Sequence, residues 1–155
     1  MKKTITIIRH AESRVNAGLC RESGEFTNCR ITDNGKEQAT KLSYSFDVLI
    51  LSPLKRVLET YTNSKIKTGD ILISHFFRET KEDHTTTNFL ENEKHSYETV
   101  EEIKLRALNA RIFIENIKSN NIGIISHCGF IYHFLIACGQ NPKYLENTES
   151  ITFDI

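Results

Sequence analysis

The sequence predicts an α/β protein, built as a three-layer sandwich in which helices cover both faces of a mostly parallel central sheet. Two observations lead to this fold class. Short apolar runs bounded by polar residues or Gly recur along the chain, and such runs are typical of buried parallel strands. Longer segments with apolar residues at helical spacing lie between them. This alternation favours a parallel sheet, because each helix carries the chain back to the start of the next strand.

The predicted strands are short and rich in Ile, Val and Leu. In chain order they are Thr4–Ile8, Val48–Leu51, Ile71–Ile73, Ile122–Ile125 and Ile151–Ile155. The last of them could be an edge strand, either covered by a partner or exposed. The sequence therefore leaves the oligomeric state open.

Helices are predicted from apolar residues at three- and four-residue intervals and from local start and stop signals. They are Asp33–Ser45, a segment that opens at Ser52-Pro53, Thr99–Lys118 and Gly129–Cys138. Thr32 is the expected N-cap of the first helix and Ser52 that of the second, where Pro53 suits the first helical position. Gly139 is the expected C′ residue of the fourth helix.

Length and charge limit the classes of protein that the chain can represent. A chain of 155 residues fits one domain over residues 1–155, in which the polar segment 81–97 forms a loop or small flap. Twenty basic side chains balance twenty acidic ones, which argues against nucleic acid or an anionic membrane as a partner. No apolar run approaches the roughly 20 residues needed to cross a bilayer. The four cysteines are scattered, and Met1-Lys2-Lys3 leads directly into a predicted strand, which is not the pattern of a signal peptide. Both features favour a cytoplasmic protein with reduced thiols.

Chemically reactive side chains follow the predicted ends of four strands. They lie in Arg9-His10, Ser52 to Arg56, Arg78-Glu79 and Ser126-His127. Ligands of open α/β sheets bind beyond the carboxyl ends of the strands, so these residues are expected to share one crevice. The set suits phosphoryl transfer, since guanidinium groups bind phosphate oxygens, an imidazole can attack phosphorus and a carboxyl can shuttle a proton. Each residue taken singly is better explained as a surface or packed side chain, and the prediction depends on their joint placement.

A series of motifs runs in order along nearly the whole chain. They are Arg9-His10-Ala11-Glu12 with Asn16, Thr32-Asp33-Asn34-Gly35 with Gln38-Ala39, Ser52-Pro53-Leu54-Lys55-Arg56 with Thr60, Glu79, Tyr97-Glu98-Thr99 with Arg106, and Ser126-His127-Cys128-Gly129. Together they resemble the histidine phosphatase superfamily, also called phosphoglycerate mutase-like proteins. The first tetrapeptide alone is a weak signal, but ordered motifs at compatible spacing are specific.

The resemblance implies a role for each residue of the strand-end cluster. His10 is the expected nucleophile, which becomes a phosphohistidine, and Glu79 is the expected general acid and base. His127 is expected to act beside them as a catalytic residue. The implied phosphate ligands are Arg9, Arg56, His127 and Asn16. No metal and no cofactor is expected, and the sequence contains no HExxH or similar metal-binding spacing.

Two positions depart from the family pattern. Ala11 stands where the family usually has Gly, which is compatible only with a negative φ. Cys128 stands in the first place of the Gly-Gly pair that usually follows the second His, and Gly129 keeps the second place. Because Cys128 adjoins His127 and two expected Arg side chains, one hypothesis is a stabilised thiolate whose oxidation inactivates the protein. The alternative is an inert packed thiol.

The expected function is that of a metal-independent phosphatase acting on a phosphate monoester or a phosphoprotein. A mutase must shield its phosphoenzyme from water, which needs more covering structure than this short chain offers. A phosphoglycerate mutase-type phosphotransferase and a non-catalytic phospho-ligand binding protein remain alternatives, although His10 and Glu79 argue against the second. The sequence does not choose between a phosphorylated small molecule and a phosphorylated protein side chain as substrate.

Overall fold

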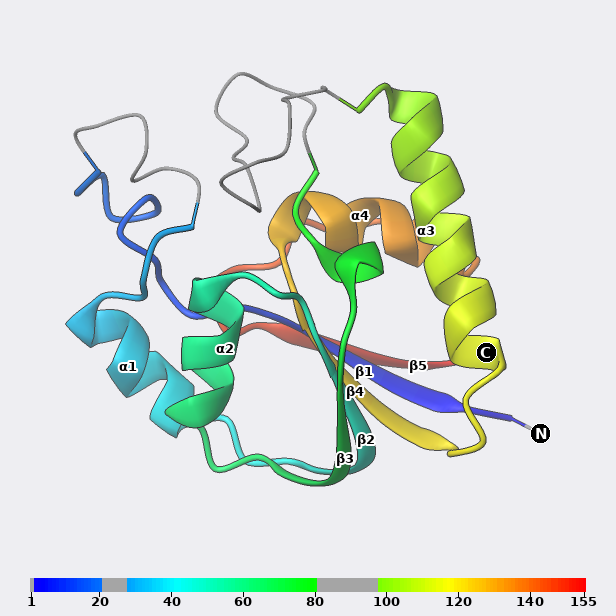
Figure 1. Cartoon of the computed structure of the whole chain (residues 1–155), viewed down its shortest axis with the longest axis horizontal. Coiled ribbons are helices and arrows are strands. Elements are labelled where there is room, and N and C mark those ends of the chain that lie inside the picture. The colour runs from blue at the N-terminus through cyan, green and yellow to red at the C-terminus, as the bar shows by residue number, and fades with distance from the viewer. Residues whose placement is uncertain (1, 21–27, 81–97) are drawn as a thin grey trace.

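Strands of one sheet form the centre of the computed structural model, which describes residues 2–20, 28–80 and 98–155. These strands are β1 (Thr4–Arg9), β2 (Ser45–Leu51), β3 (Lys67–Ile73), β4 (Asn121–Ser126) and β5 (Ser150–Asp154). Their order across the sheet is β3-β2-β4-β1-β5, in which the first four are parallel and β5 runs antiparallel to β1 (Figure 1). The prediction of a mostly parallel sheet is confirmed.

Helices cover both faces of this sheet. They are α1 (Asp33–Thr40), α2 (Lys55–Thr62), α3 (Val100–Glu115) and α4 (Cys128–Ala137), and a short 3-10 helix, η2, spans His75–Phe77. Ile7 packs in the core with side chains of α3 and α4, whereas the adjacent Ile8 packs in the core with Val57 of α2. Successive side chains of a strand point to opposite faces, so one strand serves both cores. The predicted three-layer sandwich is therefore confirmed.

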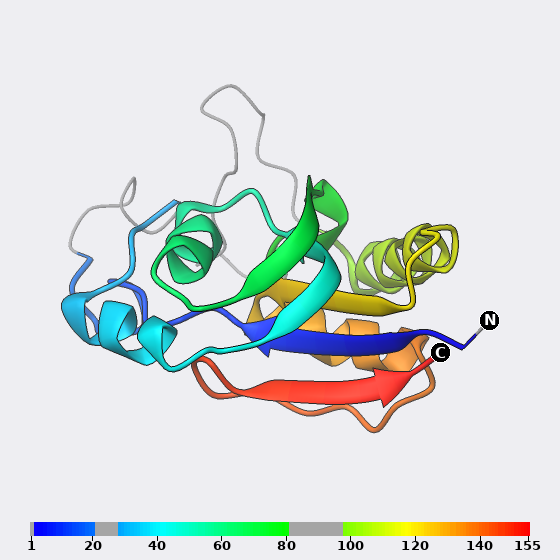
Figure 2. The same ribbon diagram turned by 90° about the horizontal axis from the view of Figure 1, so that it is seen from below.

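The pictures show how the helices are grouped. Figure 1 shows α1 beside α2 at one side of the molecule and α3 beside α4 at the other. Figure 2 shows β5 next to β1 at one edge of the sheet. The outer ends of these two strands are tied by backbone hydrogen bonds in both directions between Lys3 and Ile155, each 3.0 Å long.

Several helix ends follow the sequence signals. The Thr32 hydroxyl accepts from the Gly35 amide at 2.9 Å and caps α1, as predicted. Gly139, at φ +72°, takes the left-handed conformation after α4 that its type suggested. The predicted helix Asp33–Ser45 is wrong at its end, because α1 stops at Thr40 and Ser45 already pairs with β3 as the first residue of β2.

The start of α2 differs from the prediction in a way that matters for the site. The helix begins at Lys55 behind Leu54, which provides no side-chain cap, so the predicted N-cap role of Ser52 is wrong. The Ser52 hydroxyl instead lies 2.7 Å from Nε2 of His127. A buried hydroxyl group needs a hydrogen-bond partner, and the partner of Ser52 is the imidazole of His127, which follows the end of another strand.

The strand β3 also departs from expectation. Its apolar run was predicted to be buried, but Ile71, Leu72 and Ile73 are 45%, 37% and 60% exposed. β3 is the edge of the sheet and pairs only with β2 among the described strands. An apolar run therefore predicted the strand correctly and its burial wrongly, because edge position is decided by the order of strands in space.

Two further expectations concern the flap and membrane-spanning helices. The predicted flap at 81–97 lies outside the described residues. Within the described part of the chain, no helix is long and apolar enough to cross a membrane.

Candidate active site

Two histidines stand just past the ends of the neighbouring strands β1 and β4. Arg9 and Ser126 are partners at the last position of this pair, and the His10 amide then donates to the Ser126 carbonyl at 3.0 Å. Ser52 follows β2, and its amide donates to a carbonyl of β4 at 3.2 Å. The backbone of three adjacent strands thus brings Arg9, His10, Ser52 and His127 to one edge of the sheet.

His10 is buried and held in one tautomer. Its Nδ1 lies 2.7 Å from the carbonyl oxygen of Ala11, and because a carbonyl only accepts, Nδ1 carries the hydrogen. Burial lowers the pKa of His10 well below its ordinary value of 6.5, and the Arg56 and Arg9 cations lower it further, while the Ala11 carbonyl opposes them. The ring is therefore neutral at neutral pH, and its Nε2 lone pair is available for attack on an electrophile.

His127 lies against His10 with a different hydrogen-bonding pattern. The two ring centroids are 5.1 Å apart with their planes tilted by 58°. Nε2 of His127 is hydrogen-bonded to the Ser52 hydroxyl. The buried Nδ1 of His127 has no hydrogen-bond partner among the described residues. Burial lowers the pKa of His127 well below 6.5, with smaller contributions from Arg56 and His10. Two neutral imidazoles therefore share the centre of the site.

Two arginines provide the positive charge of the site. Arg9 donates from Nη1 to the Leu145 carbonyl at 2.7 Å, while its buried Nε has no hydrogen-bond partner among the described residues. Arg56 lies in the first turn of α2, where a solvated cation is common, but it is only 6% exposed. Burial lowers the pKa of Arg56, and the Glu79 carboxylate and the hydrogen-bonded Cys29 thiol oppose this. Arg56 is therefore a buried cation whose charge acts on His10 and Glu79, and not a solvated surface side chain.

Glu79 reaches the site from the segment after η2. Its Oε1 accepts from the Phe130 amide at 3.2 Å, in the first turn of α4, and from the Thr80 amide at 3.0 Å. The first N–H groups of a helix have no partner within the helix, so they are ready donors to this side chain. Gly129 makes this approach possible, since a Cβ at that position would lie 2.9 Å from Glu79 Oε1 and 2.7 Å from Thr80 Oγ1.

The two departures from the family pattern have different outcomes. Among the described residues other than Gly, only Thr148 has a positive φ. Ala11 therefore meets the condition of a negative φ. The Ala11 amide donates to Thr60 Oγ1 at 2.9 Å. The hypothesis of a stabilised thiolate at Cys128 is wrong, because burial raises the pKa of this thiol despite the opposing Arg9 cation. Its sulfur instead donates to the Leu145 carbonyl at 3.4 Å.

Asn16 lies on an exposed turn and is linked to the site indirectly. Its amide oxygen accepts from the amide and hydroxyl of Ser13, at 3.1 and 3.0 Å, and from Asn147 at 3.2 Å. The Asn147 side chain also donates to the His10 carbonyl at 3.0 Å. The side-chain oxygen of Asn16 is thus already engaged, and its side-chain nitrogen is the atom that could donate to a phosphate. The role of Asn16 as a phosphate ligand stays a prediction.

Sequence reasoning gave no site role to three residues that shape the site. Ser52 was counted in the strand-end cluster, but the only role predicted for it was that of a helix cap. Leu145 and Asn147 come from the irregular segment after α4, where no local pattern marks a function. Within the described residues, no group of three or more His, Cys, Asp or Glu side chains is arranged to hold a metal ion.

A family model decides what kind of protein this is. The model of the histidine phosphatase superfamily (branch 1) matches residues 5–149. The chain belongs to this superfamily. The matched range includes both histidines, both arginines and Glu79. No curated protein matches the sequence of this histidine phosphatase superfamily member at a significant level.

Solved structures of similar fold extend over almost the whole chain. A putative alpha-ribazole-5'-P phosphatase from Escherichia coli is 15% identical, with a TM-score of 0.75, over 99% of this chain and 90% of that one. Phosphoserine phosphatase from Entamoeba histolytica is 21% identical, with a TM-score of 0.70, over 97% and 90%. The mycobacterial glucosyl-3-phosphoglycerate phosphatase is 14% identical, with a TM-score of 0.70, over 99% and 91%. At these identities the likeness establishes the fold that the superfamily members share.

Proposed function

We propose that this histidine phosphatase superfamily member hydrolyses phosphate monoesters without a metal ion, through a phosphohistidine on His10. One observation carries the proposal. The 2.7 Å bond from His10 Nδ1 to the Ala11 carbonyl leaves Nε2 as the nucleophilic atom of a ring that burial and Arg56 keep neutral. A neutral imidazole with a defined tautomer is what attack on phosphorus needs.

The first step transfers the phosphoryl group to His10. The Nε2 lone pair forms a bond to phosphorus while the bond from phosphorus to the ester oxygen breaks. Glu79, in its acid form, gives its proton to the leaving oxygen. Oε1 of Glu79 is engaged by two amide groups, so Oε2 is the atom assigned to carry the proton.

The second step releases inorganic phosphate. Water attacks phosphorus, the bond from phosphorus to Nε2 breaks, and the Glu79 carboxylate takes a proton from the water. The Ala11 carbonyl accepts from Nδ1 throughout, which stabilises the phosphorylated ring and keeps it oriented. The step restores neutral His10 and the acid form of Glu79, so the cycle closes without a cofactor.

Phosphate binding is assigned to the positive groups around His10. Two buried nitrogens of the site, Nε of Arg9 and Nδ1 of His127, have no hydrogen-bond partner among the described residues. Buried polar atoms without partners are costly, and a bound oxyanion supplies acceptors for them. When the Ser52 hydroxyl donates to Nε2, the hydrogen of neutral His127 lies on Nδ1, which then donates to phosphate. Arg56 and Asn16 complete the proposed set of ligands.

The proposed substrate class is a phosphorylated small molecule or a phosphoprotein, in a cytoplasmic setting. Proteins of similar fold are named for phosphoserine, glucosyl-3-phosphoglycerate and ribazole phosphate, which are small molecules. Their names support phosphate monoesters as the class without choosing one. A panel of phosphometabolites and phosphopeptides decides between the two kinds of substrate.

The test is trapping of the phosphoenzyme. The protein is incubated with p-nitrophenyl phosphate in the presence of a chelator, quenched, and analysed for a phosphoramidate, which acid hydrolyses and alkali preserves. We expect wild-type protein to form it, and His10→Ala to lose it together with about 10⁴-fold or more of the turnover rate. The exposed His75 provides the control, since His75→Ala is expected to keep both signals.

Two results would overturn the proposal. One is turnover with chelator but with unchanged rate in His10→Ala. The other is the absence of hydrolysis with every ester of the panel. Transfer of phosphate to a second substrate position, dependent on a bisphosphate primer, would identify a mutase instead.

A further inference from the structure

Glu79 is held by side chains and not by the sheet. It follows η2 in a short irregular segment, where successive carbonyls cannot bond to a neighbouring strand. Ser126 donates from its hydroxyl to the Phe77 carbonyl at 2.7 Å. The carbonyls of Phe76, Arg78 and Glu79 all accept from one guanidinium group, that of Arg106. Side chains thus provide the hydrogen bonds that buried backbone requires.

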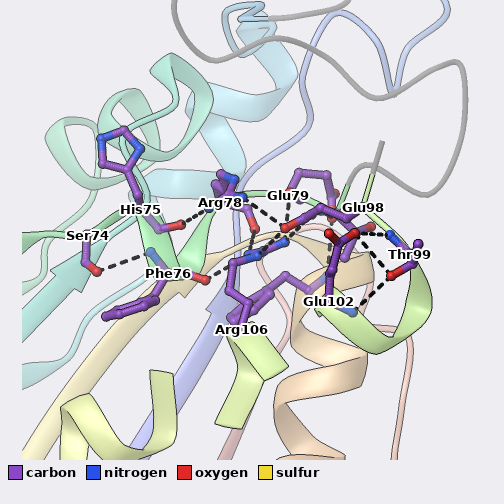
Figure 3. A network of polar contacts seen from close by, with 11 residues as sticks. Ser74, His75, Phe76, Arg78, Glu79, Glu98, Thr99, Glu102 and Arg106 are labelled. Carbon is purple, nitrogen blue, oxygen red and sulfur yellow. Dashed lines mark hydrogen bonds and ion pairs between the residues drawn. The ribbon is translucent and has the colours of Figure 1, made fainter. Parts of the chain in front are cut away.

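Arg106 is saturated by these contacts. It is 7% exposed on the inner face of α3, and Nη1 donates to the carbonyls of Phe76 and Arg78 at 2.8 and 2.9 Å. Nη2 reaches the Glu79 carbonyl at 3.3 Å. Nε and Nη2 also form a two-point contact with the carboxylate of Glu98, each bond being 2.7 Å long (Figure 3). Only a planar guanidinium can serve acceptors in so many directions.

Glu98 offsets the free-energy cost of burying the Arg106 cation. It also links the segment after η2 to helix α3. Its carboxylate, 11% exposed, neutralises Arg106 and also accepts from Arg78 at 2.9 Å. Losing one member of a buried pair leaves an uncompensated charge, which costs more than the pair itself contributes. Glu98 therefore fixes where the guanidinium of Arg106 lies.

Arg106 acts on the other support of Glu79 as well. Its guanidinium carbon lies 4.6 Å from the centre of the Phe130 ring. The amide of the same Phe130 donates to the Glu79 carboxylate. The backbone of Glu79 and the amide that holds its side chain are thus both in contact with Arg106.

We propose that Arg106, oriented by Glu98, is a positioning residue for the proton transfer carried out by Glu79. The inference rests on the proposed phosphatase function and assigns to Arg106 no contact with substrate. Loss of Arg106 is expected to displace the carboxyl group of Glu79 without moving His10. In the first step, the displaced Glu79 protonates the leaving oxygen more slowly, while the attack by His10 is unaffected.

Two esters of similar shape separate these steps. Phenyl phosphate has a poor leaving group that needs the proton, whereas p-nitrophenyl phosphate has a good leaving group that needs it little. The comparison uses kcat/KM, which reports the steps up to formation of the phosphoenzyme and not its hydrolysis, a step that both esters share. We expect Arg106→Lys to lower kcat/KM for phenyl phosphate about 100-fold, the size of effect that a misplaced catalytic group produces. For p-nitrophenyl phosphate the same variant should lose no more than about fivefold in kcat/KM. Glu79→Gln should show the same selective loss.

A double-variant cycle supplies the second readout. If Arg106 acts through Glu79, then Arg106→Lys in the Glu79→Gln background should cause almost no further loss with phenyl phosphate. Arg111→Lys is the matched control, because Arg111 lies on the same helix and also pairs with a carboxylate, Glu115, at 2.8 Å. It should leave the rates with both esters unchanged. Glu98→Gln keeps the shape of the pair and provides a second variant if Arg106→Lys does not fold.

The outcomes divide clearly. Equal loss of kcat/KM with both esters, or additive loss in the double variant, would overturn the positioning role while leaving the phosphatase proposal standing. If wild-type protein hydrolyses neither ester nor any other phosphate monoester, the phosphatase proposal fails and the role of Arg106 fails with it.

Discussion

The two halves of the candidate site are built by different means. The half that contains His10 and His127 continues the hydrogen-bonding of β1 and β4, so backbone atoms place it. The half that contains Glu79 is an irregular segment placed by the side chains of Arg106 and Ser126. Backbone positioning tolerates substitution of side chains around it, whereas side-chain positioning depends on a few individual residues. The difference predicts which remote substitutions should impair the chemistry.

Among the substitutions that test this difference, the largest effect is expected where the two halves meet, at Gly129. Gly129→Ala places a Cβ 2.9 Å from Glu79 Oε1 and 2.7 Å from Thr80 Oγ1, so the Glu79 carboxylate must move. We expect kcat for phenyl phosphate to fall about 100-fold with the fold intact, as measured by steady-state kinetics and circular dichroism. Gly139→Ala is the control, because its φ of +72° strains Ala but nothing lies within 4 Å. It should cost about 1 kcal/mol or more in stability and leave kcat unchanged. An active Gly129→Ala protein would show that the two halves are not coupled there.

A pH titration of stability probes the buried half separately. The pKa values of His10 and His127 are both well below 6.5 in the folded state, mainly because of burial. Below pH 6.5 the unfolded chain therefore binds protons that the folded protein does not, and stability falls with decreasing pH. Each histidine contributes a slope approaching about 1.4 kcal/mol per pH unit in the free energy of unfolding.

Urea titrations at several pH values measure this slope. We expect His10→Gln to reduce it between pH 6.5 and the lowered pKa of the folded protein, because one buried titrating group is removed. His75→Gln removes an exposed histidine and should leave the slope unchanged. An identical slope in His10→Gln and wild type would mean that His10 is not held neutral.

The smallest effect is expected for Ser52→Ala. His127 keeps its backbone position in this variant but loses the 2.7 Å hydrogen bond that selects its tautomer. We expect kcat/KM to fall about tenfold or less, through weaker phosphate binding, because a single hydrogen bond contributes about 1 kcal/mol. Inhibition by inorganic phosphate reports that binding directly and should weaken in parallel. Ser64→Ala, which removes a hydroxyl bonded to the Tyr61 carbonyl, should change neither value.

Sequence reasoning succeeded where a feature is local or repeats along the chain. The apolar runs located the strands, Thr32 and Gly139 marked helix ends, and strand-end residues predicted the shared edge of His10 and His127. It failed where the outcome depends on a distant partner. Ser52 was taken for a cap because its partner, His127, is 75 residues away.

Burial was the second source of error, since it depends on the order of strands and on packing. The aliphatic residues of β3 were expected to be buried, but the strand lies at the edge of the sheet. The Cys128 thiol was expected to lose its proton easily because of His127 and nearby arginines, but partial burial outweighs the charge of Arg9 and raises the pKa of the thiol. Neither strand order nor desolvation can be read from residue types alone.

The sequence by itself determined the α/β class and the residues that gather at the strand ends, because both follow from periodicity and from the direction of parallel strands. Only the tertiary structure decided how each of those residues is held. The tautomer of His10 depends on the position of the Ala11 carbonyl, and the place of Glu79 depends on Arg106, 27 residues away. Whether such a hydrogen bond forms depends on differences of a few tenths of an ångström in the separation of two atoms, which only the folded chain fixes.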